Sequence, residues 1–323
     1  MDILLGDITA LRLWRTPAVC SMARAMRPEP LPAHGLGCDA ALVARLCERH
    51  GLLAGLPHPL DLFVPQAPLR RESALVKPHV FPGVLASGTA YRLAEHVFIS
   101  SPKTMLLQLA QTHNRLALAK TAFELCGTYG RSPQAEQGFF AREPLATIDS
   151  LRRFARQQQP GTRGRTKLLQ ALVPVEDNAA SPMESLVALH LGLSGRLGGY
   201  NLGHPLLNTT LVVPNRLQKA AGRQSVRPDL YYSNGRVAVE YDSDLYHSAS
   251  ERIGSDSKRR TALELMGIRV VPLTRAQVMD PSALDAAAAL IARLLGRQLP
   301  RVHDFRVKQL QLRAQLLDFS QEL

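Results

Sequence analysis

The sequence lacks several features that would assign it to particular classes of protein. Only four of the 323 residues are cysteines, and no two of them form a CxxC pair, so neither a zinc site nor a disulfide framework is indicated. No run of about 18 uncharged apolar residues is present, which argues against a membrane-spanning helix. The N-terminal segment MDILLGDITALRLWR carries acids where a secretory signal would be basic. We therefore expect a cytoplasmic protein with reduced cysteines.

Positive charge, by contrast, is abundant and unevenly distributed. The net charge is +12. Residues 1–150 hold 15 Lys/Arg and 12 Asp/Glu, whereas residues 151–323 hold 24 and 15. A basic surface attracts polyanions, so this excess predicts a nucleic-acid partner, with DNA as the first expectation and RNA as the alternative. The competing interpretation is charge that serves solubility alone.

The length and the apolar content set the expected domain organisation. Hydrophobic residues make up 46% of the chain, which allows sizeable cores, and 323 residues suit two domains. We predict an α/β or mostly helical domain over residues 1–150 and a second domain over residues 168–300, followed by a C-terminal helix over residues 301–323. Residues 151–167 contain six basic side chains and no acid, and are predicted to form a linker that either contacts phosphates or is simply solvated.

The most informative segment is RPDLYYSNGRVAVEYDSDLYH, residues 227–247. Two runs of alternating apolar and polar residues flank Asn234 and Gly235. An Asn-Gly pair favours a type I′ turn, in which both central residues need positive φ, so a β-hairpin is predicted. The apolar face of this hairpin, which can join a core, consists of Leu230, Tyr232, Val237, Val239 and Tyr241.

The opposite face of the predicted hairpin is acidic. Counting outward from the turn places Leu230 opposite Val239 and Asp229 opposite Glu240, and Asp242 lies two residues further along the same face. Facing carboxylates repel each other, so a fold retains them only where a cation offsets the charge. A hard divalent cation with oxygen ligands would do so. The alternative is a polar sheet edge whose acids pair with Lys or Arg.

The segments around the hairpin are predicted to be helices and a strand. Ser181-Pro182-Met183-Glu184 has the pattern of a helix N-terminus, with Ser as the N-cap, Pro at the first position and Glu at the third. Glu184 thus has a structural role as a cap and an alternative role as an acid close to the hairpin. After the hairpin we expect a helix over residues 251–266, ended by Gly267, and a strand over residues 268–273.

Five pieces of the sequence in this order form a known pattern. They are Pro228-Asp229, Glu240-Tyr241-Asp242, His247, the run Asp256-Ser257-Lys258-Arg259-Arg260, and Gly267-Ile268-Arg269-Val270. Over residues 180–280 the chain resembles the PD-(D/E)xK nuclease superfamily, and most closely its very-short-patch-repair-endonuclease-like group. The resemblance implies an α/β fold with a restriction-endonuclease-like αβββαβ core and extra C-terminal helices.

The resemblance also implies an activity, which is metal-dependent hydrolysis of DNA phosphodiester bonds with Mg²⁺ or Mn²⁺ as the cofactor. The implied metal ligands are Asp229, Glu240 and Asp242, and His247 and Glu184 join them as implied catalytic residues. The expected nucleic-acid-binding residues are Arg223, Arg227, Lys258, Arg259 and Arg260.

Two positions depart from the pattern of the superfamily. Asp242 replaces the usual lysine after the second acid, and Ser243 replaces a glycine that often follows. The alternative function is therefore a catalytically inactive, nuclease-fold DNA-binding regulator or antitoxin of a toxin–antitoxin or phage-defence system. The N-terminal half, around residues 6–15 and 100–127, resembles antitoxin components of the abortive-infection type.

Overall fold

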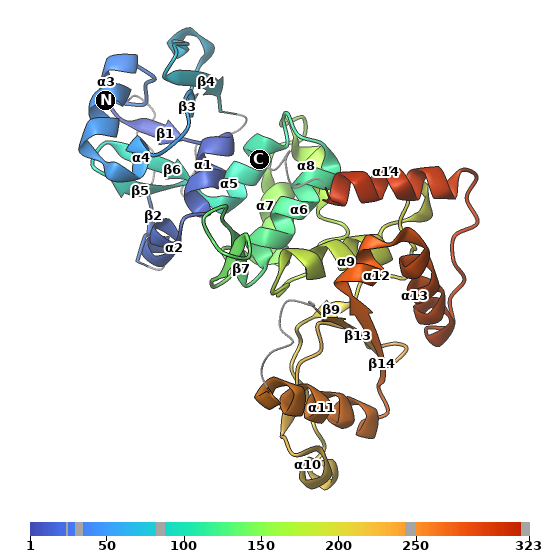
Figure 1. The fold of residues 1–323 in the computed structure, drawn as a ribbon. Helices are drawn as coiled ribbons and strands as arrows, with labels where there is room; N and C mark the ends of the chain where they lie inside the picture. Colours follow the sequence, from blue (N-terminus) through green and yellow to red (C-terminus); the bar gives the residue numbers. More distant parts are fainter. Residues whose placement is uncertain (24, 30–34, 82–87, 243–249, 318–323) are drawn as a thin grey trace. The chain divides into compact units, whose positions relative to one another are not determined.

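The chain is a mixed α/β protein, as predicted, and it folds as two compact units that divide between Val173 and Pro174. The computed structural model describes residues 1–23, 25–29, 35–81, 88–242 and 250–317, with the backbone alone over 250–257 (Figure 1). Each unit has its own sheet and its own core.

Unit 1, residues 1–173, is built on a mixed sheet of six strands in the order β2-β5-β6-β1-β3-β4. Strand β1 lies in the middle, parallel to β6 and antiparallel to β3. Every residue of β1, β3 and β6 is buried, because helices of the unit cover these central strands. The strands are β1 (Ile3–Leu5), β2 (Pro28–Glu29), β3 (Leu60–Val64), β4 (Val76–Val80), β5 (Ala90–Ala94) and β6 (Val97–Ser100), and β7 (Tyr129–Arg131) pairs with β8 (Phe139–Ala141) in a separate hairpin.

The helices of unit 1 begin largely where the sequence predicts. Asp39 caps α3 by accepting a hydrogen bond from the Leu42 amide at 2.8 Å, and Ser101 caps α5. At α1, Gly6 is the N-cap, and Asp7, the first helical residue, is buried with a φ of 48°. The helices are α1 (Asp7–Trp14), α2 (Pro17–Ala23), α3 (Ala40–Arg49), α4 (Gly51–Ala54), α5 (Pro102–Leu109), α6 (Arg115–Cys126), α7 (Ile148–Gln157) and α8 (Arg165–Ala171).

The basic segment 151–167 belongs to unit 1. Most of α7 and the start of α8 lie within it, and both helices bury apolar side chains, including Leu151 and Ala155 of α7 and Leu168 of α8. The boundary therefore falls after α8 and not on either side of a linker. Amphipathic spacing explains the difference, since Leu151 and Ala155 lie four residues apart on one face of a helix whose other face is basic.

Unit 2 contains a mixed sheet of four strands in the order β14-β13-β12-β9. Strand β12 is antiparallel to both β9 and β13, and β13 is parallel to β14. A parallel pair needs a crossover, which α11 supplies between β13 and β14. The strands are β9 (Leu206–Leu207), β12 (Leu230–Tyr232), β13 (Val237–Asp242) and β14 (Arg269–Thr274), with the two-stranded pair β10 (Leu211–Val212) and β11 (Ser225–Val226) beside them.

The helices of unit 2 surround this sheet. The element that leads into it, α9, has Ser181 as its N-cap, as predicted. Between α9 and the hairpin, residues 208–213 contain only the short strand β10, and the basic segment 216–227 contains most of α10. The helices are α9 (Pro182–Gly192), α10 (Asn215–Ala221), α11 (Ser250–Leu265), α12 (Arg275–Met279), α13 (Pro281–Leu294) and α14 (Phe305–Leu317).

The central hairpin has the predicted register but a different turn. Leu230 pairs with Val239, which confirms the register. The positive φ lies at Arg236, at 50°, and not at Asn234 and Gly235, so the turn is not of type I′. Gly235 meets a different requirement: a Cβ atom at this position would lie 2.4 Å from Leu295 Cδ2. Glycine is needed there for close packing.

Candidate acidic site of unit 2

Asp229 and Glu240, called the acid pair below, lie on the face of the sheet that α11 covers. Ala238 of β13 packs with Ala262 and Leu263 of α11, and Glu240 follows Ala238 on the same face by the two-residue period of a strand. Coverage by this helix leaves the Asp229 and Glu240 side chains only 15% and 12% exposed. The acid pair is therefore largely shielded from water.

Arg259 of α11 offsets the charge of the acid pair. Its Nη2 atom lies 2.8 Å from Glu240 Oε2, and its Nη1 atom lies 4.0 Å from Asp229 Oδ1. Two carboxylates with little solvent would repel each other strongly, and one guanidinium between them reduces that cost. The two acids thus converge on a single cation, and here that cation is a side chain of the same chain.

Backbone groups fix the position of Asp229. The Tyr241 amide donates to Asp229 Oδ2 at 2.8 Å, and the Asn208 amide donates to the Asp229 carbonyl at 3.0 Å. One carboxylate oxygen is thus held by the neighbouring strand while Oδ1 is directed toward Arg259. The hairpin that carries the acid pair also determines the orientation of its first member.

Glu184 lies at the start of α9 and is linked to the same region through Asn208. Its Oε2 atom accepts hydrogen bonds from the Ala180 amide at 2.8 Å and from Asn208 Nδ2 at 2.5 Å, while Ser181 Oγ donates to Oε1 at 2.9 Å. Burial raises the pKa of Glu184 to about 7, and the charge of Asp229 adds to the rise. Glu184 is therefore both a cap and an acid near Asp229.

Asn208 is the residue of this site that sequence reasoning missed. It has a φ of 46°, and its side-chain amide and backbone amide bond Glu184 and Asp229 respectively. Asparagine tolerates positive φ better than most residues, which is the only signal that the sequence offered. Arg227, whose Nε donates to the Asn208 carbonyl at 2.6 Å, extends this link.

The predicted three-acid ligand set is not assembled as such. Asp242 ends β13 as an exposed residue, and His247 lies outside the described residues. Among the residues that the structure describes, no group of three or more His, Cys, Asp and Glu side chains is placed to hold a metal ion. The acid pair still fits Mg²⁺, because this ion is commonly held by one or two carboxylates and completes its shell with waters and phosphate oxygens.

Basic residues lie beside the acid pair. Lys258 and Arg260, on either side of Arg259, are exposed, and Arg260 pairs with Glu264 one turn further along α11 at 3.1 Å. The Cδ atom of Lys258 lies 4.0 Å from the Cβ position of Gly222, at the end of α10, next to Arg223. Three predicted nucleic-acid-binding residues thus lie on α11, Arg223 lies just beyond the end of α10, and Arg227 is exposed on the segment that leads into β12.

The unit boundary changes the distribution of charge inferred from the sequence. Residues 1–173 hold 21 Lys/Arg and 12 Asp/Glu, a net +9, whereas residues 174–323 hold 18 and 15, a net +3. Six of the nine excess positive charges counted over residues 151–323 thus belong to unit 1 and not to the unit that contains the acid pair. The six basic residues of 151–167 account for the difference, because α7 and α8 belong to unit 1.

The described residues include no membrane-spanning helix, and the chain as a whole matches no family model, curated protein or solved structure. Within the described part of the chain, no helix combines the length and the apolar character that crossing a membrane would require. Comparison with protein-family models, with curated proteins and with solved structures finds no match to this chain.

Proposed function

We propose that unit 2 is a metal-dependent, endonuclease-like domain that hydrolyses DNA phosphodiester bonds. The observation that carries this proposal is the convergence of Asp229 and Glu240 on one cationic group, with Glu184 connected to Asp229 through Asn208. A fold does not need two largely buried carboxylates directed at one point for stability, since burying carboxylates together is costly. An acid with a raised pKa, as at Glu184, is typical of sites that bind or transform a ligand.

The element order of unit 2 supports the same proposal. Helix α9, strands β9, β12 and β13, helix α11 and strand β14 follow one another as in the αβββαβ core of the resembling superfamily, with the α10 region inserted after β9. Asp229 directly precedes β12, Glu240 lies in β13 and Glu184 lies in the first helix. These are the positions that the sequence resemblance assigns to the acids.

The roles proposed for the chain's own residues follow from their positions. Asp229 and Glu240 would hold Mg²⁺ or Mn²⁺, which when bound polarises a phosphate and lowers the pKa of a coordinated water. Arg259 would leave the acid pair for the phosphodiester anion as the cation enters, so that both negative groups keep a positive partner. Exposed Lys258, Arg260 and Arg227 would contact flanking phosphates.

A cleavage assay with matched variants tests the proposal. Plasmid and linear DNA are incubated with the full chain and Mg²⁺ or Mn²⁺, with an RNA of the same sequence as a parallel substrate. Asp229→Asn and Glu240→Gln should abolish metal-dependent cleavage, whereas Glu264→Gln, an exposed acid on α11, should retain it. Cleavage that is unaffected in both acid-pair variants would contradict the proposed site.

One observation favours the alternative of an inactive DNA-binding regulator or antitoxin. Arg259 already offsets part of the negative charge of the acid pair, so a metal is not the only cation that can compensate these carboxylates. Calorimetric titration of Mg²⁺ and Mn²⁺ into the protein, with and without DNA, separates the two functions. DNA binding without metal binding or cleavage would favour the regulator, whereas metal binding that disappears in Asp229→Asn would favour the nuclease.

A further inference from the structure

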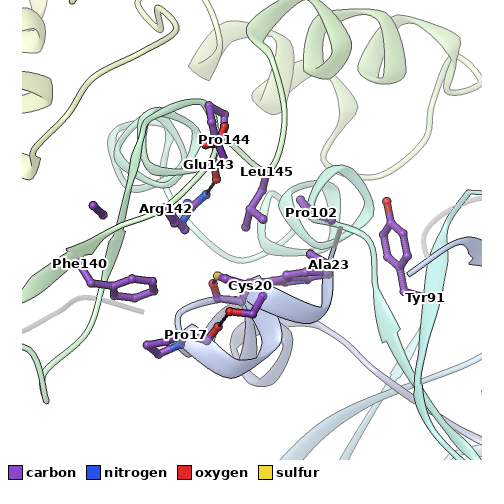
Figure 2. A pocket seen from close by; sticks show the side chains of 13 residues that line it. Pro17, Cys20, Ala23, Tyr91, Pro102, Phe140, Arg142, Glu143, Pro144 and Leu145 are labelled. Carbon is purple, nitrogen blue, oxygen red and sulfur yellow. Dashed lines mark hydrogen bonds between the residues drawn. The ribbon is translucent and has the colours of Figure 1, made fainter. Parts of the chain in front are cut away.

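Unit 1 contains a cavity of about 510 Å³ to which the proposed nuclease chemistry assigns no role (Figure 2). It lies between α2, the first residue of α5, Tyr91 of β5 and the segment that follows β8. This volume is within the usual range of sites for small organic ligands, which is about 300–1,000 Å³. The cavity is formed by residues of one unit only, so its shape is fixed within that fold.

Much of the wall is apolar and aromatic. The Trp14 indole N–H donates to the Ser100 carbonyl at 2.9 Å, and its ring meets Tyr91 edge to face at 5.8 Å between centroids. With its polar atom satisfied, Trp14 presents an apolar surface held in one orientation. The other apolar lining residues used in this argument are Pro17, Phe140 and Leu145.

Arg142 supplies a positive charge to this apolar wall. Its Nη1 donates to the Glu143 carbonyl at 2.9 Å, as Figure 2 shows, and its Nη2 donates to the Glu124 carbonyl at 2.6 Å. Carbonyl groups satisfy donors but leave the formal charge in place. The Nε–H of Arg142 is buried and has no acceptor among the described residues. Nε lies against Gly130, so Arg142 brings to the cavity wall the positive charge of its guanidinium and not this buried N–H.

The nearest buried acid is already committed to other groups. The Glu124 carboxylate is 2.6 Å from Arg15 Nη2 and accepts a further hydrogen bond from the Arg131 amide at 3.0 Å. These contacts hold the pKa of Glu124 below its usual value in spite of its burial, so it is ionised, and Arg15 balances it. The cluster of Arg15, Arg142 and Glu124 therefore carries one excess positive charge.

Gly130 allows Arg142 and Phe140 to occupy these positions. A Cβ atom on Gly130 would lie 2.8 Å from both Arg142 Nε and Phe140 Cζ, so any other residue would push both side chains away. Gly130 pairs with Phe140 across β7 and β8. The cation and an aromatic ring are thus held next to each other by the same small hairpin.

We propose that this cavity binds a small organic anion with an aromatic or apolar body and one carboxylate, phosphate or sulfonate group. The body would fill the space among Trp14, Tyr91 and Phe140, and the anionic group would accept hydrogen bonds from Arg142. A partly buried cation without a carboxylate partner is costly, and a bound anion relieves that cost while adding a charge-assisted hydrogen bond. The proposal is independent of the function proposed for unit 2.

The test compares two aromatic probes that differ in charge. The anionic probe is 8-anilinonaphthalene-1-sulfonate, and the neutral one is N-phenyl-1-naphthylamine; both are titrated by fluorescence into the folded full chain. We expect one saturable site for the anionic probe, with roughly tenfold or greater preference over the neutral probe. Arg142→Met should remove most of this preference, and Arg45→Met, an exposed arginine of α3, should leave it unchanged.

A second variant keeps the test decisive if Arg142→Met does not fold, which circular dichroism would reveal. Ser21→Trp places a large ring at an exposed lining position of α2 and should weaken binding of both probes by blocking the cavity. Equal binding of the two probes to the wild type, or unchanged binding in folded Ser21→Trp, would overturn the proposal. A soluble competitor such as benzoate should displace the anionic probe.

Discussion

At the scale of single residues, burial displaces the pKa values of two groups in unit 2 in opposite directions. Burial, reinforced by the charge of Asp229, raises the pKa of Glu184 to about 7, and burial lowers the pKa of His190 to about 3, with Arg313 contributing. Both groups are therefore mostly neutral in the folded chain near pH 6, where their unfolded counterparts are largely or partly charged. The free energy of unfolding must therefore depend on pH through both groups.

Glu184→Gln should change the pH dependence of unfolding in a defined direction. Between pH 4.5 and 7 the folded wild type binds the proton of Glu184 more tightly than the unfolded chain, so this group makes the fold less stable as pH rises. Relative to the wild type, the free energy of unfolding of the variant should rise by about 1–3 kcal/mol as the pH goes from 4 to 8. Urea denaturation across this range measures it, with the exposed Glu264→Gln as control. Parallel curves for wild type and Glu184→Gln would contradict the assignment.

His190→Leu should stabilise unit 2, increasingly so at acid pH. His190 is fully buried, and neither ring nitrogen has a hydrogen-bond partner among the described residues. The unfolded chain takes up a proton below about pH 6.5 that the folded chain does not, so the wild type loses stability as pH falls, by about 2 kcal/mol at pH 5. Denaturant unfolding at pH 5 and 8 tests this, and His303→Leu, whose side chain is 93% exposed, is the control. A variant less stable than the wild type at pH 5 would contradict it.

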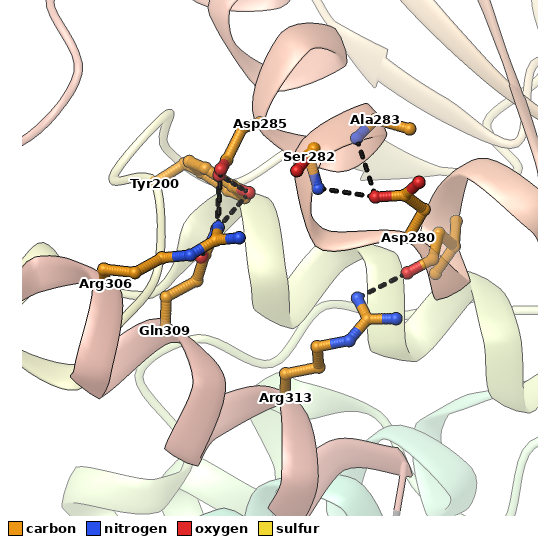
Figure 3. A network of polar contacts seen from close by, with 9 residues as sticks. Tyr200, Asp280, Ser282, Ala283, Asp285, Arg306, Gln309 and Arg313 are labelled. Carbon is orange, nitrogen blue, oxygen red and sulfur yellow. Dashed lines mark hydrogen bonds and ion pairs between the residues drawn. The ribbon is translucent and has the colours of Figure 1, made fainter.

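At the scale of elements, polar side chains hold helix α14 in place. Figure 3 shows Tyr200, Asp285 and Gln309 in one network, in which the Tyr200 hydroxyl donates to Asp285 Oδ1 at 2.7 Å. Arg306 joins this network, with its Nη1 2.7 Å from Asp285 Oδ2. Arg313, one turn beyond Gln309, donates to the carbonyls of Val278 and Met279 at the end of α12. Hydrogen bonds therefore orient this helix in addition to apolar packing.

This inner face explains why part of α14 could not be predicted. The apolar pattern of the sequence places Leu310 in the core, but the residue is 44% exposed, whereas Gln309 and Arg313 are buried. Residues 309, 312, 313 and 316 form the buried stripe, and two of the four are polar. A pattern based on apolar residues cannot locate a face whose anchors are an amide and a guanidinium, because their partners lie elsewhere in the chain.

Arg313→Met should loosen the contact between α14 and α12. The substitution keeps most of the side-chain volume but leaves two carbonyls at the end of α12 without their donor, a loss of about 1–3 kcal/mol. Urea denaturation measures the loss, and hydrogen exchange should show faster exchange in α12 and α14. Arg301→Met removes an exposed arginine close in sequence and is the control. If the two variants are equally stable, the hydrogen bonds of Arg313 do not hold the helix.

The acidic hairpin shows how far local pattern reaches at this scale. Its register was predictable because apolar alternation and the turn position together specify which residues face each other. The turn type was not predictable, because Gly235 is required by a contact with Leu295, sixty residues away in the chain. The position of Arg259 over the acid pair likewise depends on how α11 crosses the sheet. Long-range packing therefore determines the turn type and the position of Arg259, which the local sequence does not specify.

At the scale of the whole molecule, most of the excess positive charge lies in unit 1, whereas the acid pair lies in unit 2. Residues 1–173 carry a net +9, and their α7–α8 segment has no acid between residues 150 and 175. Arg153, Arg156 and Arg163 of this segment are exposed. On the proposed function, the chain should therefore take part of its affinity for DNA from the basic residues of unit 1, in addition to the phosphate contacts proposed for unit 2.

The triple variant Arg153→Gln, Arg156→Gln, Arg163→Gln should weaken DNA binding uniformly across sequences, because phosphate contacts carry no sequence information. Each lost contact lowers the slope of log K against log salt by about 0.9, so three contacts would lower it by up to about 2.7. Fluorescence anisotropy at several salt concentrations measures this slope.

A charge-matched triple of exposed arginines elsewhere in unit 1, Arg45→Gln, Arg70→Gln and Arg71→Gln, separates a local contact surface from a general effect of net charge. Both triples remove three positive charges from the same unit, so nonspecific attraction falls equally in each. A larger fall in slope for the α7–α8 triple would therefore place phosphates on that segment. Equal slopes in the two variants would mean that its charge acts only through the long-range field, and that the phosphate contacts lie elsewhere, with the basic residues of α10 and α11 beside the acid pair as the next candidates.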